Sequence, residues 1–156
     1  MATFDDLEVA GDEAAEPRCV LLDTNVLLDY VDRNRPEHAT ARGLIHLLLG
    51  GNFLIFACAH SFKDMYYILQ RAHHSEEIAR RLVRGLLECV PMTPLDLTND
   101  ILVRSVASDE PDFEDGLVRS TAETVHIGCI VTRDAKAFTG SSVPVLSPQE
   151  LLASLQ

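Results

Sequence analysis

The chain has 156 residues, of which 47% are hydrophobic and 24% are charged, and its formal net charge is −11. These proportions are typical of one compact globular domain, and no apolar stretch reaches the roughly 18 residues that a membrane-spanning helix needs. The first seventeen residues contain six acids and no Lys or Arg. This is the opposite of a signal peptide and favours a cytoplasmic protein.

The negative charge does not exclude a nucleic-acid partner. Proteins that bind the phosphate backbone usually carry an excess of Lys and Arg. Here six acids lie in the first seventeen residues, so the rest of the chain carries a charge of only −5. Acids that gather at one metal site would also be partly neutralised when cations bind.

Strands and helices alternate along the sequence after an acidic start. Residues 1–17 lack hydrophobic periodicity and are predicted to be a disordered tail, followed by one domain at 18–156. Strands are predicted at 18–22, 53–58, 89–92, 128–132 and 143–146. Helices are predicted at 26–31, 36–49, 61–71, 75–88, 98–106 and 112–126, and again from 147. The pattern predicts an α/β fold, a three-layer α/β/α sandwich with a central, mainly parallel sheet of about five strands.

The cysteines and histidines give no sign of a metal site. Cys19, Cys58, Cys89 and Cys129 each lie in or beside an apolar run, without C-x-x-C spacing. They are predicted to be small buried residues in a reducing compartment rather than disulfide partners or zinc ligands. The pair at 73–74 is predicted to lie in an exposed loop.

Aspartates follow two of the predicted strands. Asp23 comes directly after the first strand and Asp134 follows the fourth. Asp64 lies near the start of the helix after the second strand. Ligands of open α/β sheets bind outside the carboxyl ends of the strands, so these three acids are expected to converge there.

A fourth acid, Asp115, lies in the first turn of the helix that leads into the fourth strand. That helix is expected to begin at the opposite end of the sheet unless it crosses the edge obliquely, so spacing alone does not place Asp115. Helix capping is an alternative role for two of the acids, because Asp64 follows Ser61, and Asp115 follows Asp112, at capping-box distance. Asp23 could equally begin a turn, and Asp134 could be an ordinary loop acid.

Clustered carboxylates suit a hard divalent cation. Like charges held close together raise one another's pKa values unless a positive charge lies among them. Mg²⁺ prefers oxygen ligands and keeps several waters, so a few carboxylates and a substrate phosphate complete its coordination.

Several segments together strongly resemble a PIN domain over residues 20–152. They are LDTNVLLD at 22–29, DFED at 112–115, IVTRD at 130–134 and VPVLSPQE at 143–150. SFKDMYYIL at 61–69 is similar to the family's second acidic motif, in which many relatives have Glu where this chain has Asp64. Relatives also often carry an acid immediately before the phenylalanine at 138, where this chain has Ala137.

The resemblance implies a parallel-sheet nuclease that hydrolyses RNA phosphodiester bonds with Mg²⁺ or Mn²⁺, a metal-dependent endoribonuclease. Matched onto the family's motifs, the catalytic and metal-binding acids are Asp23, Asp64, Asp115 and Asp134, and the match places Asp115 in the site. Asn25, Asp112 and Thr132 are candidates to support these acids through hydrogen bonds.

Small PIN proteins of this size resemble the toxins of VapBC-type toxin–antitoxin pairs. The resemblance implies a homodimer that acts on RNA, and a cognate antitoxin protein, with no membrane partner. A catalytically inactive PIN-fold module that binds RNA or protein is the main alternative. A phosphoaspartyl enzyme fits less well, because Asn25 stands where a haloacid dehalogenase has a second Asp, and Lys63 and Lys136 do not suit a receiver domain.

Overall fold

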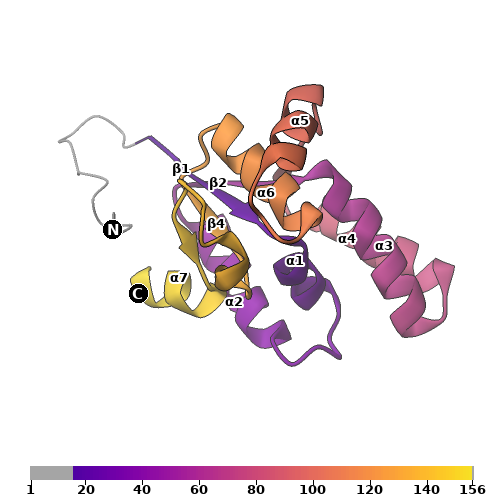
Figure 1. The fold of residues 1–156 in the computed structure, drawn as a ribbon. Helices are drawn as coiled ribbons and strands as arrows, with labels where there is room; N and C mark the ends of the chain where they lie inside the picture. The colour runs from indigo at the N-terminus through magenta and orange to yellow at the C-terminus, as the bar shows by residue number, and fades with distance from the viewer. Residues whose placement is uncertain (1–15, 156) are drawn as a thin grey trace.

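A five-stranded parallel sheet forms the centre of the structure, a computed structural model that describes residues 16–155 (Figure 1). The predicted tail at 1–17 therefore lies almost entirely outside the described residues. The strands are β1 (Arg18–Leu22), β2 (Phe53–Cys58), β3 (Met92–Leu95), β4 (Cys129–Val131) and β5 (Val145–Leu146). Their order is β3-β2-β1-β4-β5, and every neighbouring pair is parallel.

Strand β1 lies at the point where the strand order reverses. The chain proceeds from β1 to β2 and β3 on one side, then crosses back to β4 and β5 on the other. The carboxyl ends of β1 and β4 are in register, with Leu22 opposite Val131, and the Asp23 N–H donates to the carbonyl of Val131 at 3.0 Å. Such a switch point is where open α/β sheets bind their ligands.

Helices cover both faces of the sheet, which confirms the predicted three-layer α/β/α fold. They are α1 (Thr24–Val31), α2 (His38–Gly50), α3 (Ala59–His73), α4 (Glu76–Cys89), α5 (Asn99–Ala107), α6 (Phe113–Thr124), the 3₁₀ helix η2 (Ala135–Phe138) and α7 (Pro148–Ser154). No helix within residues 16–155 is long and apolar enough to cross a membrane.

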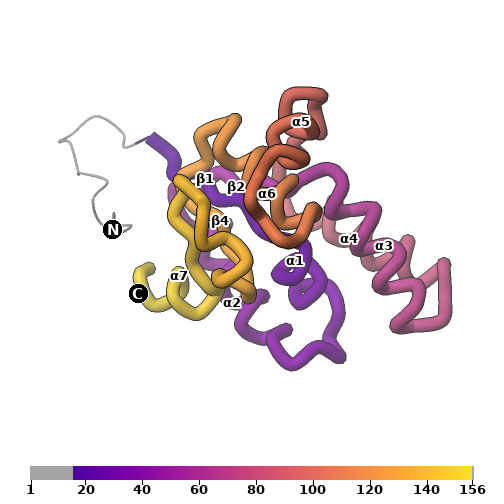
Figure 2. Tube along the Cα trace, viewed as in Figure 1, coloured from indigo at the N-terminus to yellow at the C-terminus, as the bar shows by residue number. Residues whose placement is uncertain are grey.

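Alternate residues of β1 pack into the two hydrophobic cores on opposite faces of the sheet. Val20 and Leu22 belong to a core with residues of α1, α2, α3, α4 and α7, whereas Leu21 belongs to a core with residues of α6 and η2. This alternation follows from the two-residue period of a strand. Although α7 ends the chain, it packs beside α2, as the tube in Figure 2 shows.

Two predicted boundaries were wrong. The third strand is Met92–Leu95 rather than 89–92, because α4 continues to Cys89 and the Val90 N–H still bonds the carbonyl of Leu86. Pro94 fits in β3 because β3 is an edge strand. The exposed loop predicted at 73–74 is confirmed for His74 only, which is an exposed turn residue with a left-handed φ of 50°, whereas His73 is half-buried in the last turn of α3.

The four cysteines are free thiols, and they differ in burial. Cys58 and Cys129 are buried as expected, and burial raises the pKa of each thiol to about 12. Cys19 is half-buried and Cys89 is exposed. The prediction of buried cysteines was therefore wrong for Cys89, because it lies on the outer side of α4 at the end of the helix.

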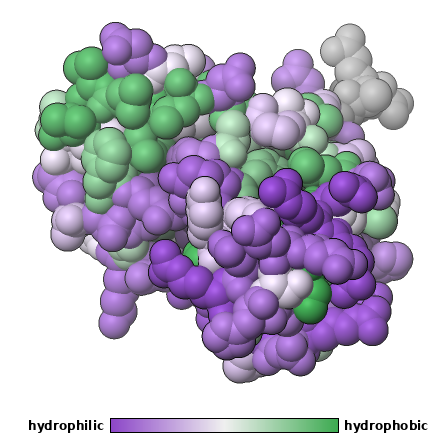
Figure 3. All heavy atoms as spheres, turned by 90° about the vertical axis from the view of Figure 1, so that its right-hand side faces the viewer, coloured by the Kyte–Doolittle hydropathy of each residue, from purple (hydrophilic) through white to green (hydrophobic). Residues whose placement is uncertain are grey.

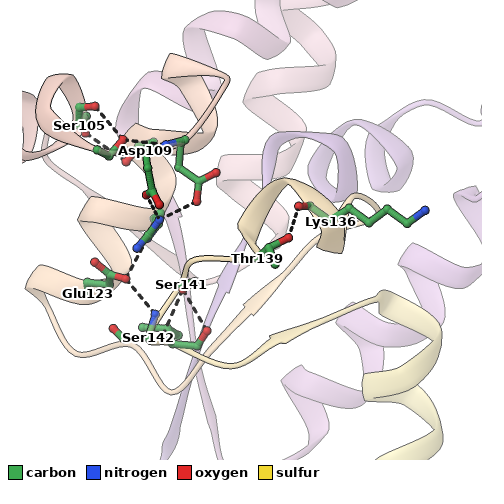
Figure 4. A network of polar contacts seen from close by, with 12 residues as sticks. Ser105, Asp109, Glu123, Lys136, Thr139, Ser141 and Ser142 are labelled. Atoms are coloured by element: carbon green, nitrogen blue, oxygen red, sulfur yellow. Dashed lines mark hydrogen bonds and ion pairs between the residues drawn. The ribbon is translucent and has the colours of Figure 1, made fainter. Parts of the chain in front are cut away.

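Arg119 connects α6 with two loops through a network of polar contacts that includes Asp109, Glu123 and Ser142 (Figure 4). Its guanidinium forms ion pairs with Asp109 at 3.1 Å and Glu110 at 2.9 Å, both in the loop between α5 and α6, and with Glu123 at 3.1 Å. Glu123 also accepts a hydrogen bond from the Ser142 N–H at 3.0 Å, in the loop before β5. Arg119 thus holds the loop that precedes Asp115 directly, and through Glu123 it holds the loop that follows Asp134.

Candidate active site

Asp23 stands at the carboxyl end of β1 and is also the N-cap of α1. One carboxylate oxygen accepts a hydrogen bond from the Thr24 N–H at 2.7 Å. The other accepts from the Asn25 amide at 2.8 Å and from the Thr132 hydroxyl at 2.7 Å. Only 6% of Asp23 is exposed, so these three donors fix the orientation of a buried carboxylate.

Burial raises the pKa of Asp23 above its ordinary value. The hydrogen bonds from Thr132 and from the Thr24 N–H work against this rise, and the negative charge of Asp134 adds to it. Desolvation penalises the ionised form, whereas donors aimed at the carboxylate favour it. A nearby cation would therefore stabilise the ionised form of Asp23.

Asn25 and Thr132 join the start of α1 to the loop after β4. The Asn25 amide also donates to the Thr132 hydroxyl oxygen at 3.0 Å, and its carbonyl oxygen accepts from the Arg133 N–H at 3.1 Å. The Thr132 oxygen accepts in turn from the Asp134 N–H at 3.0 Å. These bonds hold the exposed Asp134 next to the buried Asp23.

Asp115 lies at the same edge of the sheet as Asp23, not at the opposite end. Helix α6 runs antiparallel to the strands, because just beyond its end the Gly128 N–H bonds the carbonyl of Cys19 near the start of β1. The helix therefore begins where the strands end, as helices between parallel strands do. The expectation from spacing was wrong because it reversed this direction.

Asp115 is a second acid of the site whose pKa is raised. Burial raises its pKa to about 6, and the negative charges of Asp23, Asp112 and Asp134 contribute to the rise. Asp112 caps α6, with one oxygen accepting from the Glu114 N–H at 2.7 Å and the Asp115 N–H at 3.4 Å. Capping is thus performed by Asp112, which leaves the Asp115 side chain available to the site.

Asp64 lies within α3 rather than at its N-cap, and its negative charge contributes to the raised pKa of Glu114. Its helix begins at Ala59, so Ser61 is not the N-cap, and the predicted capping alternative for Asp64 was wrong. Ser61 is buried instead and accepts a hydrogen bond from the Thr24 hydroxyl at 2.8 Å. The Asp64 carboxylate lies 3.0 Å from the ammonium group of Lys63.

Glu114 is an additional acid of this site. Burial raises its pKa, and the charges of Asp64 and Asp23 raise it further. Glu114 therefore shares an electrostatic environment with Asp64 and Asp23. Its position beside Asp115 in the first turn of α6 was the only sequence signal for it.

A buried acid behind the site, Asp29, was not singled out from the sequence. Its side chain is 2% exposed and forms ion pairs with Arg35 at 2.6 Å and Arg133 at 2.8 Å. Asp29 thereby holds the residue next to Asp134. The available signal was an acid within the apolar stretch of α1, where unpaired charges are rarely buried.

Nowhere in the described part of the chain do three or more His, Cys, Asp or Glu side chains group closely enough to enclose a metal ion. The oxygens of Asp23 already accept hydrogen bonds, and Asp64 is paired with Lys63. The donor set still fits Mg²⁺ or Mn²⁺ chemically, because Mg²⁺ keeps several waters and often binds only one or two carboxylates. The carboxylates that contribute to the raised pKa of Asp115 are the hard oxygen ligands that such a cation would use.

Comparisons with known proteins agree with this architecture. The PIN domain family matches residues 19–136. The chain is 24% identical over 132 residues to ribonuclease VapC1 of Aquifex aeolicus, covering 84% of this chain and 91% of that protein.

Solved structures share the fold. VapC20 of Mycobacterium tuberculosis, described as a sarcin-ricin loop cleaving toxin, is similar with a TM-score of 0.57 and 17% identity, over 71% of this chain and 86% of that one. A toxin–antitoxin complex from Klebsiella pneumoniae is similar with a TM-score of 0.57 and 21% identity, over 83% and 97% of the two chains. The match of the family to residues 19–136, which is most of the chain, shows that this protein belongs to the PIN domain family.

Proposed function

We propose that this protein is a metal-dependent endoribonuclease that hydrolyses RNA phosphodiester bonds, and that it is the toxin of a VapBC-type pair. The observation that carries the proposal is the half-buried Asp115, whose pKa is raised to about 6 by burial and further by the negative charges of Asp23, Asp112 and Asp134. The relative named ribonuclease VapC1 supports the same activity.

Asp23, Asp64, Asp115 and Asp134 are the residues that would hold Mg²⁺ or Mn²⁺. When bound, the cation supplies positive charge at the phosphate and lowers the pKa of a water that can attack it. Because Asp115 is more basic than an ordinary aspartate, it competes well for a cation or a proton near neutral pH.

The surrounding residues position these acids. Thr132 and Asn25 hold one oxygen of Asp23, so the carboxylate cannot rotate freely. Asp112 fixes the first turn of α6 and therefore the backbone of Asp115. No serine, cysteine or histidine nucleophile is needed for this chemistry.

We further propose a homodimer and an antitoxin protein as partners. The similar complex from Klebsiella pneumoniae contains a toxin and an antitoxin. Exposed hydrophobic side chains on and beside α5 offer a surface for a protein partner, and Figure 3 shows hydrophobic side chains gathered in the upper part of one face. They are Leu97, Leu102, Val103, Val106 and Phe113.

An inactive PIN-fold binding module is the second candidate. It is favoured by the absence of a group of three metal-binding side chains within residues 16–155 and by the ion pair between Lys63 and Asp64. The ammonium group of a lysine can neutralise an acid that would otherwise need a metal ion.

A cleavage assay separates the two candidates. Purified protein is incubated with end-labelled RNA in Mg²⁺, Mn²⁺ or EDTA, alongside Asp23→Asn and the matched control Asp100→Asn, an exposed acid of α5 paired with Arg104. We expect cleavage with either metal by the parent and the control, and at least a hundredfold loss in Asp23→Asn, the size typical of a lost electrostatic group in an active site. Equal cleavage by Asp23→Asn, or none by the parent with either metal, would contradict the nuclease proposal.

A further inference from the structure

Two open depressions meet on the surface formed by α1, α2 and α4, and none of the acids of the site lines either of them. One of about 570 Å³ follows α2, and one of about 360 Å³ lies against both α2 and α4. Tyr30, His38 and Arg42 line both. We call the joined depressions the α2–α4 groove, which is defined by Tyr30, Arg33, Arg42, Leu49, Arg81 and Cys89.

The lining of this groove is positively charged in a strongly acidic protein. It includes three arginines and two histidines, and no Asp or Glu. Arg33, Arg42 and Arg81 are exposed, and their guanidinium groups form no ion pair or hydrogen bond with any residue between 16 and 155. By contrast, Arg35 and Arg119 are both paired with acids. The groove therefore offers guanidinium groups whose charge is not neutralised by the described chain.

Hydrophobic side chains lie among these charges. Leu49 is 42% exposed, and Tyr30 and Leu82 are half-buried in the lining. A ligand that matches both properties is a peptide segment in which acids alternate with apolar residues. Arginine and carboxylate pair well because the planar guanidinium can donate two parallel hydrogen bonds.

The chain itself contains such a segment, residues 1–16. It carries six acids and no Lys or Arg, and Phe4, Leu7 and Val9 are interspersed among the acids. Residues 1–15 lie outside the described part of the structure.

The segment joins the domain close to one end of the groove. The Arg18 N–H donates to the carbonyl of Asn52 at 3.0 Å, two residues beyond the end of α2 at Gly50. Leu49, in the last turn of α2, lines the groove. The thirteen residues of α2 span about 20 Å. Fifteen residues of extended chain reach about 50 Å, which is enough to follow the whole groove.

We propose that the acidic N-terminal segment, residues 1–16, binds in the α2–α4 groove of its own chain. Tethering gives such a segment an effective concentration in the millimolar range, so modest contacts suffice and the intrachain contact is favoured over one between chains. Any protein that uses this groove must first displace the segment. The proposal does not rest on the nuclease activity, because the groove contains none of the acids of the site.

Disulfide trapping in the full chain tests the proposal, because the groove already contains an exposed thiol, Cys89. Phe4→Cys, Leu7→Cys and Val9→Cys are made singly and oxidised with copper phenanthroline, and the linked peptides are mapped by mass spectrometry. We expect at least one position to form an intrachain disulfide with Cys89. Raising the salt from 0.1 to 1 M should slow the reaction several-fold, since the screening length falls from about 10 Å to about 3 Å.

Charge reversal supplies the matched comparison. Arg42→Glu combined with Arg81→Glu should also slow the cross-link several-fold, whereas Arg71→Glu with Arg104→Glu, outside the groove, should leave the rate unchanged. Thermal melts check that each variant is folded. The proposal is overturned if none of the three positions links to Cys89, if the links form only between chains, or if both charge-reversed pairs give the same rate.

Discussion

Asp115 combines partial burial with neighbouring carboxylates from two other segments, Asp23 and Asp134, and with Asp112 and Glu114 at the start of its own helix. Its folded-state pKa of about 6 lies above the ordinary value of 3.8. Folding therefore favours the protonated form of this residue. The ionised form destabilises the metal-free protein, an effect that grows as the pH rises from about 4 through 6.

We therefore expect Asp115→Asn to be more stable than the parent protein at pH 7 without metal, and equally stable below about pH 4, where the parent residue is protonated in both states. The measurement is the melting temperature of both proteins between pH 3.5 and 8 in EDTA. Addition of Mg²⁺ at pH 7 should raise the melting temperature of the parent more than that of the variant. A difference that does not change with pH would contradict the pKa assigned to Asp115.

The acids of the site differ in how far they could be recognised from the sequence alone. Asp23 could be recognised from the sequence, because it directly follows an apolar strand that ends at the switch point. Asp29 could not, because its role depends on Arg133, which lies far from it in the sequence. Glu114 could be recognised only as a neighbour of Asp115, whereas the effect of Asp64 on its pKa depends on the fold.

At the scale of elements, local signals defined most helices well. The capping box at the start of α7 is present as predicted: the Ser147 hydroxyl oxygen accepts from the Glu150 N–H at 3.1 Å, and Glu150 accepts from the Ser147 N–H at 2.8 Å. Such caps depend on residues three apart, so the sequence contains the whole interaction. The start of α3 was misplaced because Cys58 supplies no side-chain cap there.

Ser147→Ala should lower the free energy of unfolding by about 1 kcal/mol, because it removes the acceptor for an amide at the start of α7. Urea unfolding followed by circular dichroism measures the loss. Ser154→Ala is the control, since that hydroxyl only donates to the carbonyl of Leu151 near the helix end, and it should cost less than about 0.5 kcal/mol. Equal losses in the two variants would show that the capping box contributes little.

Across the whole molecule, Arg119 connects elements that the backbone separates. It holds the loop between α5 and α6 through Glu110, and through Glu123 it holds the loop that contains Ser142. The Glu110 side chain is only 5% exposed, so removal of its partner leaves a poorly solvated charge.

Arg119→Met should therefore cost about 2 to 3 kcal/mol of unfolding free energy, more than an exposed ion pair is worth. The matched control is Arg104→Met, whose pair with Asp100 is more than half exposed on both sides and should cost less than about 1 kcal/mol. Both losses are measured by urea unfolding at pH 7. If the two variants lose the same free energy, the network around Arg119 does not join these loops energetically.

The sequence by itself determined the alternation of strands and helices, the parallel sheet and the position of Asp23 at a strand end. These features depend on local hydrophobic periodicity and on residues a few positions apart in the sequence. Only the tertiary structure decided which acids share an electrostatic environment, as Asp115 does with Asp23 and Asp134. It also brought the Thr132 hydroxyl to Asp23, 109 positions away. The direction of α6, the burial of Asp29 and the α2–α4 groove likewise arise only when distant segments pack together, because a pKa, a buried ion pair and a groove are properties of neighbours in space.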